Sequence, residues 1–152
     1  MANEELTPEL ALAIGRGLGV RLEAGSTVLI GRDTRRSGAF LEAAVAAGLA
    51  SAGVDVELGG VLPTPAVAEL VARGEQVAGV VISASHNPFP DNGIKLFGPD
   101  GFKLPDEEEA LIEAVMADDD GRRPTAGDVG DIIAWPEGLD HYRDSLVARF
   151  EG

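Results

Sequence analysis

Apolar positions along the chain recur with a helical period in some segments and form short continuous runs in others. Leu10, Ile14 and Leu18 lie four residues apart and follow Thr7-Pro8, a hydroxyl N-cap with a proline at the first helical position. This pattern predicts a helix that ends near residue 22. Similar patterns predict further helices at about 38–52, 65–72, 106–117 and 137–150.

Short runs rich in β-branched residues separate these helices. Residues 26–30, 54–58 and 77–82 are too short for buried helices, and the run 77–82 has the continuous apolar character of a strand covered on both faces. Residues 94–97 and 102–104 flank the turn sequence Gly98-Pro99-Asp100-Gly101, which predicts a β-hairpin. Residues 132–133 suit one further short strand.

Strands and helices alternate along the chain, an order typical of α/β domains. We therefore expect a single domain over residues 1–152, with a mainly parallel mixed sheet of about four strands, helices on both faces and the β-hairpin after a polar loop. A chain of this length can bury most of its apolar surface and fold alone. Loops that follow parallel strands gather at one edge of the sheet, so the polar loops 31–38 and 83–92 should share that edge.

The net charge is strongly negative, −14 at pH 7, from 26 acidic and 12 basic residues. This charge repels nucleic acid and anionic membranes, so binding to either is not expected. The acidic start does not resemble a signal peptide and the chain has no cysteine, which together favour a cytoplasmic protein. The acidic runs 106–109 and 118–120 are typical of solvated helix ends or loops, and the second lacks the spacing of a calcium loop.

The loop at 83–92 contains the residues best suited to chemistry. Ser85, His86 and Asn87 supply a hydroxyl, an imidazole and an amide, and Pro88 prevents a helix through them. The only two lysines of the chain, Lys95 and Lys103, lie close to this loop in the sequence. Either an arginine-rich composition has left two incidental surface lysines, or an ammonium group is needed here, and composition leaves both interpretations open.

The loop at 31–38 contains three arginines and leads into a helix. Ser37-Gly38 at the helix start can bind an anion, because the first backbone N–H groups have no partner inside the helix. Alternatively, Arg32 forms a structural ion pair with Asp33 or another acid. Acyl transfer by Ser85 is not favoured, since the chain lacks a G-x-S-x-G elbow and His86 is its immediate neighbour. A serine among cationic side chains better suits phosphoryl transfer.

Three motifs resemble those of the α-D-phosphohexomutase superfamily and occur in the same order. They are an active-site loop, Ser83-Ala84-Ser85-His86-Asn87-Pro88 with Asp91-Asn92-Gly93-Ile94-Lys95; an arginine loop, Gly31-Arg32-Asp33 with Arg36-Ser37-Gly38; and Leu62-Pro63-Thr64-Pro65. The resemblance covers essentially the whole chain. Within the superfamily, DNGIK at 91–95 looks most like the phosphoglucosamine mutase family. Phosphomannomutase/phosphoglucomutase relatives tend to have YNGFK there, and their specificity is the alternative.

The resemblance implies specific roles for residues of these loops. Ser85 would be the serine carried as phosphoserine, which transfers its phosphoryl group to a hexose monophosphate and recovers one from the other end of the bisphosphate intermediate. Lys95 and His86 match positions assigned to proton transfer and charge stabilisation. Arg32 and Arg36 match the arginine loop near the phosphoserine.

The resemblance also implies cofactors. Mg²⁺ would contact this chain only through the phosphate on Ser85, and a hexose 1,6-bisphosphate would serve as the phosphorylating activator. Ser37 and Asn87 are the further candidates for binding phosphate or substrate.

The chain departs from the family pattern in the segments that it lacks. Relatives open with a G-T-D-G-I-R-G-like segment, and three further domains supply a D-G-D-G-D metal site, a G-E-x-S-G sugar loop and an R-x-S-G-T-E-P phosphate loop; residues 1–152 contain none of these. We therefore expect the first domain of a four-domain phosphosugar mutase, with a phosphosugar and the missing domains as partners, and no complete reaction by this chain alone. The alternative is a non-catalytic α/β domain used as a folding or assembly unit. Surface left exposed without the missing parts predicts some self-association.

Overall fold

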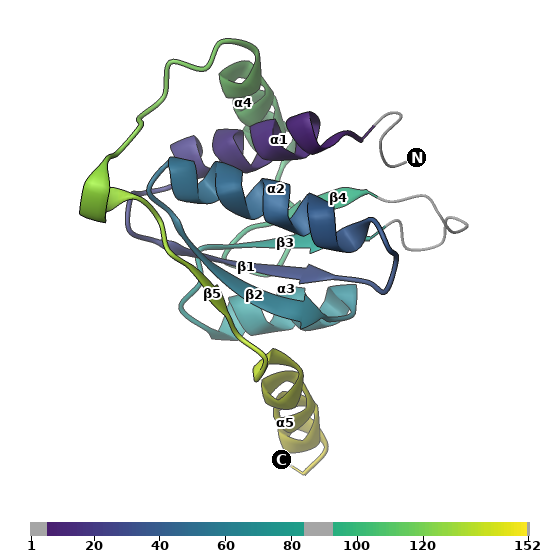
Figure 1. Ribbon diagram of the computed structural model, residues 1–152. Helices are drawn as coiled ribbons and strands as arrows, with labels where there is room; N and C mark the ends of the chain where they lie inside the picture. The colour runs from purple at the N-terminus through teal and green to yellow at the C-terminus, as the bar shows by residue number, and fades with distance from the viewer. Residues whose placement is uncertain (1–5, 84–92, 152) are drawn as a thin grey trace.

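The computed structural model describes residues 6–83 and 93–151. Within these ranges the chain forms five α-helices, one 3-10 turn and five strands (Figure 1). In chain order they are α1 (Pro8–Arg21), β1 (Thr27–Arg32), α2 (Gly38–Ser51), β2 (Asp55–Val61), α3 (Thr64–Arg73), β3 (Ala78–Ile82), β4 (Ile94–Phe97), α4 (Asp106–Ala117), the turn η1 (Ala126–Asp128), β5 (Ile132–Ala134) and α5 (Gly138–Glu151).

The strands form one mixed sheet in the order β4-β3-β1-β2-β5. β1 is parallel to β2 and β3, β5 is parallel to β2, and β4 is antiparallel to β3. The predicted α/β class and mainly parallel mixed sheet are therefore confirmed. The sheet has five strands where about four were expected, and its outer strand β5 is the short strand predicted at 132–133; it pairs Ile132 with Val56 and Ala134 with Leu58 along the outer edge of β2.

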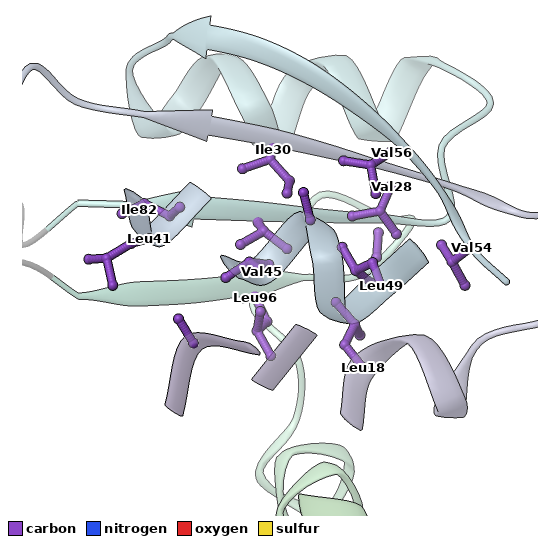
Figure 2. Packing of buried hydrophobic residues seen from close by; sticks show 14 of the residues in the cluster. Leu18, Val28, Ile30, Leu41, Val45, Leu49, Val54, Val56, Ile82 and Leu96 are labelled. Atoms are coloured by element: carbon purple, nitrogen blue, oxygen red, sulfur yellow. The ribbon is translucent and has the colours of Figure 1, made fainter. Parts of the chain in front are cut away.

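Helices cover both faces of the sheet, with α1, α2 and α4 on one side and α3 and α5 on the other (Figure 1). Successive side chains of a strand point to opposite faces. Val28 and Ile30 of β1 therefore enter the cluster under α1 and α2, which Figure 2 shows, whereas Leu29 enters a smaller cluster under α3. The larger cluster also contains Leu18, Leu41, Val45, Leu49, Val54, Val56, Ile82 and Leu96.

Local capping explains where several helices begin and end. The N–H of Leu10 donates to Oγ1 of Thr7 at 3.1 Å, and the proline predicted for the first turn of α1 is in place. Gly53 follows α2 with a φ of 86°, the left-handed conformation that glycine commonly adopts at a helix end. The first turn of α4 holds the acidic run 106–109, whose charge complements the helix dipole.

Two strand predictions differ in detail from the structure. β2 continues beyond residue 58 to Val61, and the register between β1 and β2 shifts at Gly59, just before Gly60 with its φ of 74°. The hairpin at 94–104 consists of one antiparallel bridge, Phe97 to Lys103, beside a turn in which Gly101 has a φ of 82°. β4 pairs mainly with β3, so the segment between them links antiparallel neighbours. None of the helices in the described ranges is long and apolar enough to cross a membrane.

Candidate functional site

Four residues in register across the sheet define the edge where the three sequence motifs meet. Arg32, the last residue of β1, is paired with Val61 of β2 on one side and with Ile82 of β3 on the other. Ile82 is paired in turn with Ile94, the first residue of β4. The motif segments 33–38, 62–65 and 83–93 all leave the sheet from this row. The first polar loop and the two described ends of the second therefore meet at one edge, as predicted.

Backbone hydrogen bonds hold the three segments together where they leave the sheet. The N–H of Asp33 donates to the carbonyl of Ile82 at 3.1 Å, and the N–H of Leu62 donates to the carbonyl of Arg32 at 2.9 Å. The N–H of Ser83, which is buried, donates to the carbonyl of Gly93 at 2.9 Å. The two ends of the segment 84–92 are therefore fixed beside the arginine loop.

Three predicted site residues fall within the segment 84–92. Ser85, His86 and Asn87 lie outside the described residues. Their roles therefore stay predictions, and the structure shows only where the two ends of their segment join the sheet.

Arg32 lies on the face of the sheet that α2 covers. Its stem passes Gly38, where an added Cβ would come within 3.2 Å of Cδ of Arg32. One turn further along α2, Oε2 of Glu42 lies 3.5 Å from Nε of Arg32. Burial raises the pKa of Glu42 above its ordinary value, and the positive charge of Arg32 acts in the opposite direction. Arg32 thus has the structural acid partner that one interpretation of the sequence required, and this acid is Glu42.

The other arginines of this loop differ in their surroundings. Arg35 is mostly buried and forms an ion pair with Asp33, whose Oδ1 also accepts a hydrogen bond from the N–H of Arg35 at 3.0 Å. Arg36, the arginine proposed for the site from the sequence, is exposed at the edge. Ser37 is the N-cap residue of α2, although its side chain makes no capping hydrogen bond. Neither Arg35 nor Glu42 was predicted as a site residue, although Glu42 lies one helical turn from Gly38.

Lys95 lies on the opposite face of the sheet from Arg32. It follows Ile94 on β4 and pairs with Val81 of β3. Its neighbour Leu96 packs into the cluster under α1 and α2, and Phe97 packs against the cluster under α3. Because side chains alternate along a strand, Lys95 points to the α3 side. Its Cα is one residue from the row that contains Arg32, so the two cations approach the same edge from different faces.

The described ranges, 6–83 and 93–151, contain no group of three or more histidine, cysteine, aspartate or glutamate residues arranged to hold a metal ion. The cationic side chains at the sheet edge instead suit an anionic ligand or a phosphoryl group.

Comparison with known proteins identifies the family of this chain. Residues 1–123 match the family model for phosphoglucomutase/phosphomannomutase, alpha/beta/alpha domain I. The chain is 51% identical over 159 aligned positions to the phosphoglucosamine mutase of Frankia alni, with 97% of this chain and 35% of that protein covered. It is 54% identical to the phosphoglucosamine mutase of Streptococcus pneumoniae strain 70585, with 97% and 34% covered.

A solved structure shows the same fold. The phosphoglucomutase/phosphomannomutase family protein of Burkholderia thailandensis superposes with a TM-score of 0.79 at 30% identity, over 96% of this chain and 33% of that one. The chain thus spans about a third of the length of the relatives that it matches. The family model, the sequence identities and the superposition agree that the chain belongs to the α-D-phosphohexomutase superfamily, as its domain I.

Proposed function

We propose that this chain is the phosphoserine-bearing domain of a phosphosugar mutase, with Ser85 as the residue that exchanges the phosphoryl group. The register row through Arg32 and Ile82 carries the proposal, because it brings the ends of the Ser85 segment beside the arginine loop. Family membership supports this assignment. In this proposal residues 1–152 form one domain, and further domains complete the active site.

In the proposed reaction, phosphoserine at Ser85 transfers its phosphoryl group to a hexose monophosphate. The bisphosphate then turns, and Ser85 takes back a phosphoryl group from the other position. Lys95 and His86 assist proton transfer and stabilise charge at the reacting oxygens, while Arg32 lies near the phosphoserine. Cationic side chains at this edge are suited to phosphoryl transfer, because groups that are positioned in advance stabilise the charge on the transferring phosphoryl group.

Three further residues belong to the proposed phosphate and substrate contacts. Arg36 is exposed at the edge and can reach a ligand without breaking a buried contact. Ser37 stands at the start of α2, where backbone N–H groups favour an anion, and Asn87 adjoins His86 in the sequence.

Magnesium enters this proposal through the phosphate on Ser85 alone. No three carboxylate or imidazole side chains of the described residues are grouped to hold it, and in this proposal its protein ligands come from a further domain. When bound, Mg²⁺ neutralises charge on the phosphoryl group. The chain's own part is to carry that phosphate on Ser85 at the sheet edge.

The proposed substrate pair is glucosamine 6-phosphate and glucosamine 1-phosphate. Relatives named phosphoglucosamine mutase, at 50–54% identity, support this choice over phosphomannomutase/phosphoglucomutase specificity. Because the chain spans only about a third of these relatives, we propose that it does not complete the isomerisation alone.

The first test is the intact mass of the folded chain before and after incubation with a hexose 1,6-bisphosphate and Mg²⁺. We expect one phosphate to be added, and none in Ser85→Ala. Ser145→Ala is a matched control, since the hydroxyl of Ser145 donates to Oε1 of Glu69 at 2.9 Å, away from the row. An unchanged mass of the folded wild-type chain would contradict the proposal and favour the non-catalytic folding or assembly unit.

A further inference from the structure

Glu42 and Arg32 form a buried charged pair with an incomplete contact. Oε2 of Glu42 and Nε of Arg32 are 3.5 Å apart, and the two side chains are 13% and 26% exposed. Among the described residues, neither of these two buried atoms has a hydrogen-bond partner. Buried polar atoms are nearly always hydrogen-bonded, so an unsatisfied pair at a functional edge requires an explanation.

A contribution to the stability of the folded state does not account for an ionised carboxylate at Glu42. Burial raises the pKa of Glu42 above its ordinary value, and the charge of Arg32 only partly offsets this effect. The folded state therefore holds its proton to higher pH than the unfolded chain does. The free energy of unfolding falls as the pH rises through the interval between the two pKa values. Ionisation of Glu42 therefore lowers the free energy of unfolding relative to the protonated form.

The surrounding geometry limits where the guanidinium of Arg32 can lie. Gly38 leaves room for the arginine stem where a larger residue would contact Cδ, and Glu42 stands one turn further along the same helix face. On its other side, Nη1 of Arg32 lies 3.5 Å from the carbonyl of Asp33, whose N–H is bonded to Ile82. Glu42 thus contacts the guanidinium from the helix side at the base of the active-site edge.

We propose that Glu42 is a positioning residue, which holds the guanidinium of Arg32 at the sheet edge where the arginine loop begins. This inference rests on the proposed function. An arginine side chain can adopt many conformations, and a misplacement of about 1 Å can reduce a rate about 100-fold. Through its charge and its position, Glu42 restricts the Arg32 side chain to one conformation. The cost is a lower free energy of unfolding, because the carboxylate of Glu42 is buried.

The test compares Glu42→Gln with the wild-type chain in the rate of Ser85 phosphorylation by a hexose 1,6-bisphosphate, followed by intact mass. We expect the limiting rate constant to fall about 10- to 100-fold, while the melting temperature at neutral pH stays equal or rises. If Glu42 were merely structural, Glu42→Gln would lower the melting temperature and leave the rate constant unchanged. Equal rates in the two proteins would overturn the proposal.

Glu69→Gln is the matched control, because Glu69 is another largely buried carboxylate with arginine partners. Burial raises the pKa of Glu69, but hydrogen bonds from Ser145, Arg149 and Arg73 more than offset this and lower it overall. The control should lower the melting temperature and leave the phosphorylation rate within about twofold. A positioning role would also be overturned if both variants lost phosphorylation rate in proportion to their loss in melting temperature.

A second measurement separates this proposal from the proposed function. In ¹⁵N-labelled chain, the Nε–H resonance of Arg32, assigned with Arg32→Lys, should shift in Glu42→Gln and remain in place in Glu69→Gln. If the wild-type chain takes up no phosphate, the proposed function fails while a shifted resonance still supports positioning of Arg32 by Glu42. An unshifted resonance would overturn positioning whatever the phosphorylation result.

Discussion

Arg16 is a charged residue in the middle of α1, yet it is only 6% exposed. Its guanidinium fills its donor positions, with Nε donating to Oδ2 of Asp119 at 2.7 Å and Nη1 and Nη2 donating to the carbonyls of Ser51, Gly121 and Arg122 at 2.7–3.1 Å. A buried charge is tolerated when it is paired and fully hydrogen-bonded. Asp119 supplies the opposite charge, so this acid is structural.

We expect Asp119→Asn to lower the free energy of unfolding at neutral pH by about 1–3 kcal/mol, because a buried guanidinium loses its charged acceptor. The hydrogen bond from Arg16 lowers the pKa of Asp119. The stabilisation by Asp119 is therefore present above the ordinary aspartate pKa and is lost as the pH falls through the lower folded-state value. Urea unfolding at a series of pH values should show the difference between the two proteins shrinking in acid.

Asp140→Asn serves as the control for that experiment, since Asp140 is 64% exposed and pairs with Arg143 at the surface. Surface pairs of this kind contribute about 0–1 kcal/mol. A difference for Asp119→Asn that stays constant into acid, or that matches the control, would show that Asp119 does not act through its charge.

At the scale of elements, helices α1 and α2 pack with their backbones in contact. A Cβ on Gly48 would lie 2.3 Å from the carbonyl oxygen of Leu12 and 2.5 Å from the nitrogen of Arg16. A Cβ on Gly15 would lie 2.2 Å from the carbonyl oxygen of Val45. These glycines let α2 lie between α1 and the sheet, which places the start of α2 at the sheet edge where the motifs meet.

Gly48→Ala should therefore destabilise the protein by about 1–3 kcal/mol, although alanine has the higher helix propensity. The helices have to separate, because the opposing atoms belong to the backbone. Chemical denaturation measures the change. Gly127→Ala is the control, since a Cβ there meets nothing within 4 Å and the φ is not positive. A Gly48→Ala protein as stable as the control would show that the helices separate easily.

Elements were predictable where a local rule determines them, as with the Thr7 cap of α1 and the Gly53 end of α2. The meeting of the motifs at one edge also followed from the expected parallel strands, because the loops after such strands gather at one edge of the sheet. The pairs Arg16–Asp119 and Arg32–Glu42 were not predictable, because each joins segments whose contact depends on packing. In the sequence, Arg16 has the helical position of an ordinary surface arginine, and Glu42 stands alone among alanines.

At the scale of the whole molecule, β5 and α5 carry several exposed apolar side chains. Ile132 and Ile133 are 43% and 53% exposed on an edge strand, and Leu139, Val147 and Phe150 of α5 are 48%, 47% and 90% exposed. Edge strands and contiguous apolar patches promote association. The net charge of −14 opposes contact between two copies, and salt screens this repulsion.

We therefore expect size-exclusion chromatography with light scattering to show an average mass that rises with protein concentration and rises further with salt. Ile133→Lys should reduce the effect, because it places a charge on the edge strand that a second copy would contact. Leu111→Ser is the control, since Leu111 is 46% exposed on α4, away from this surface. A strictly monomeric chain at every concentration and salt level would contradict the prediction. Association that Leu111→Ser weakens as much as Ile133→Lys would place the contact elsewhere, because only the second substitution changes the edge of the sheet.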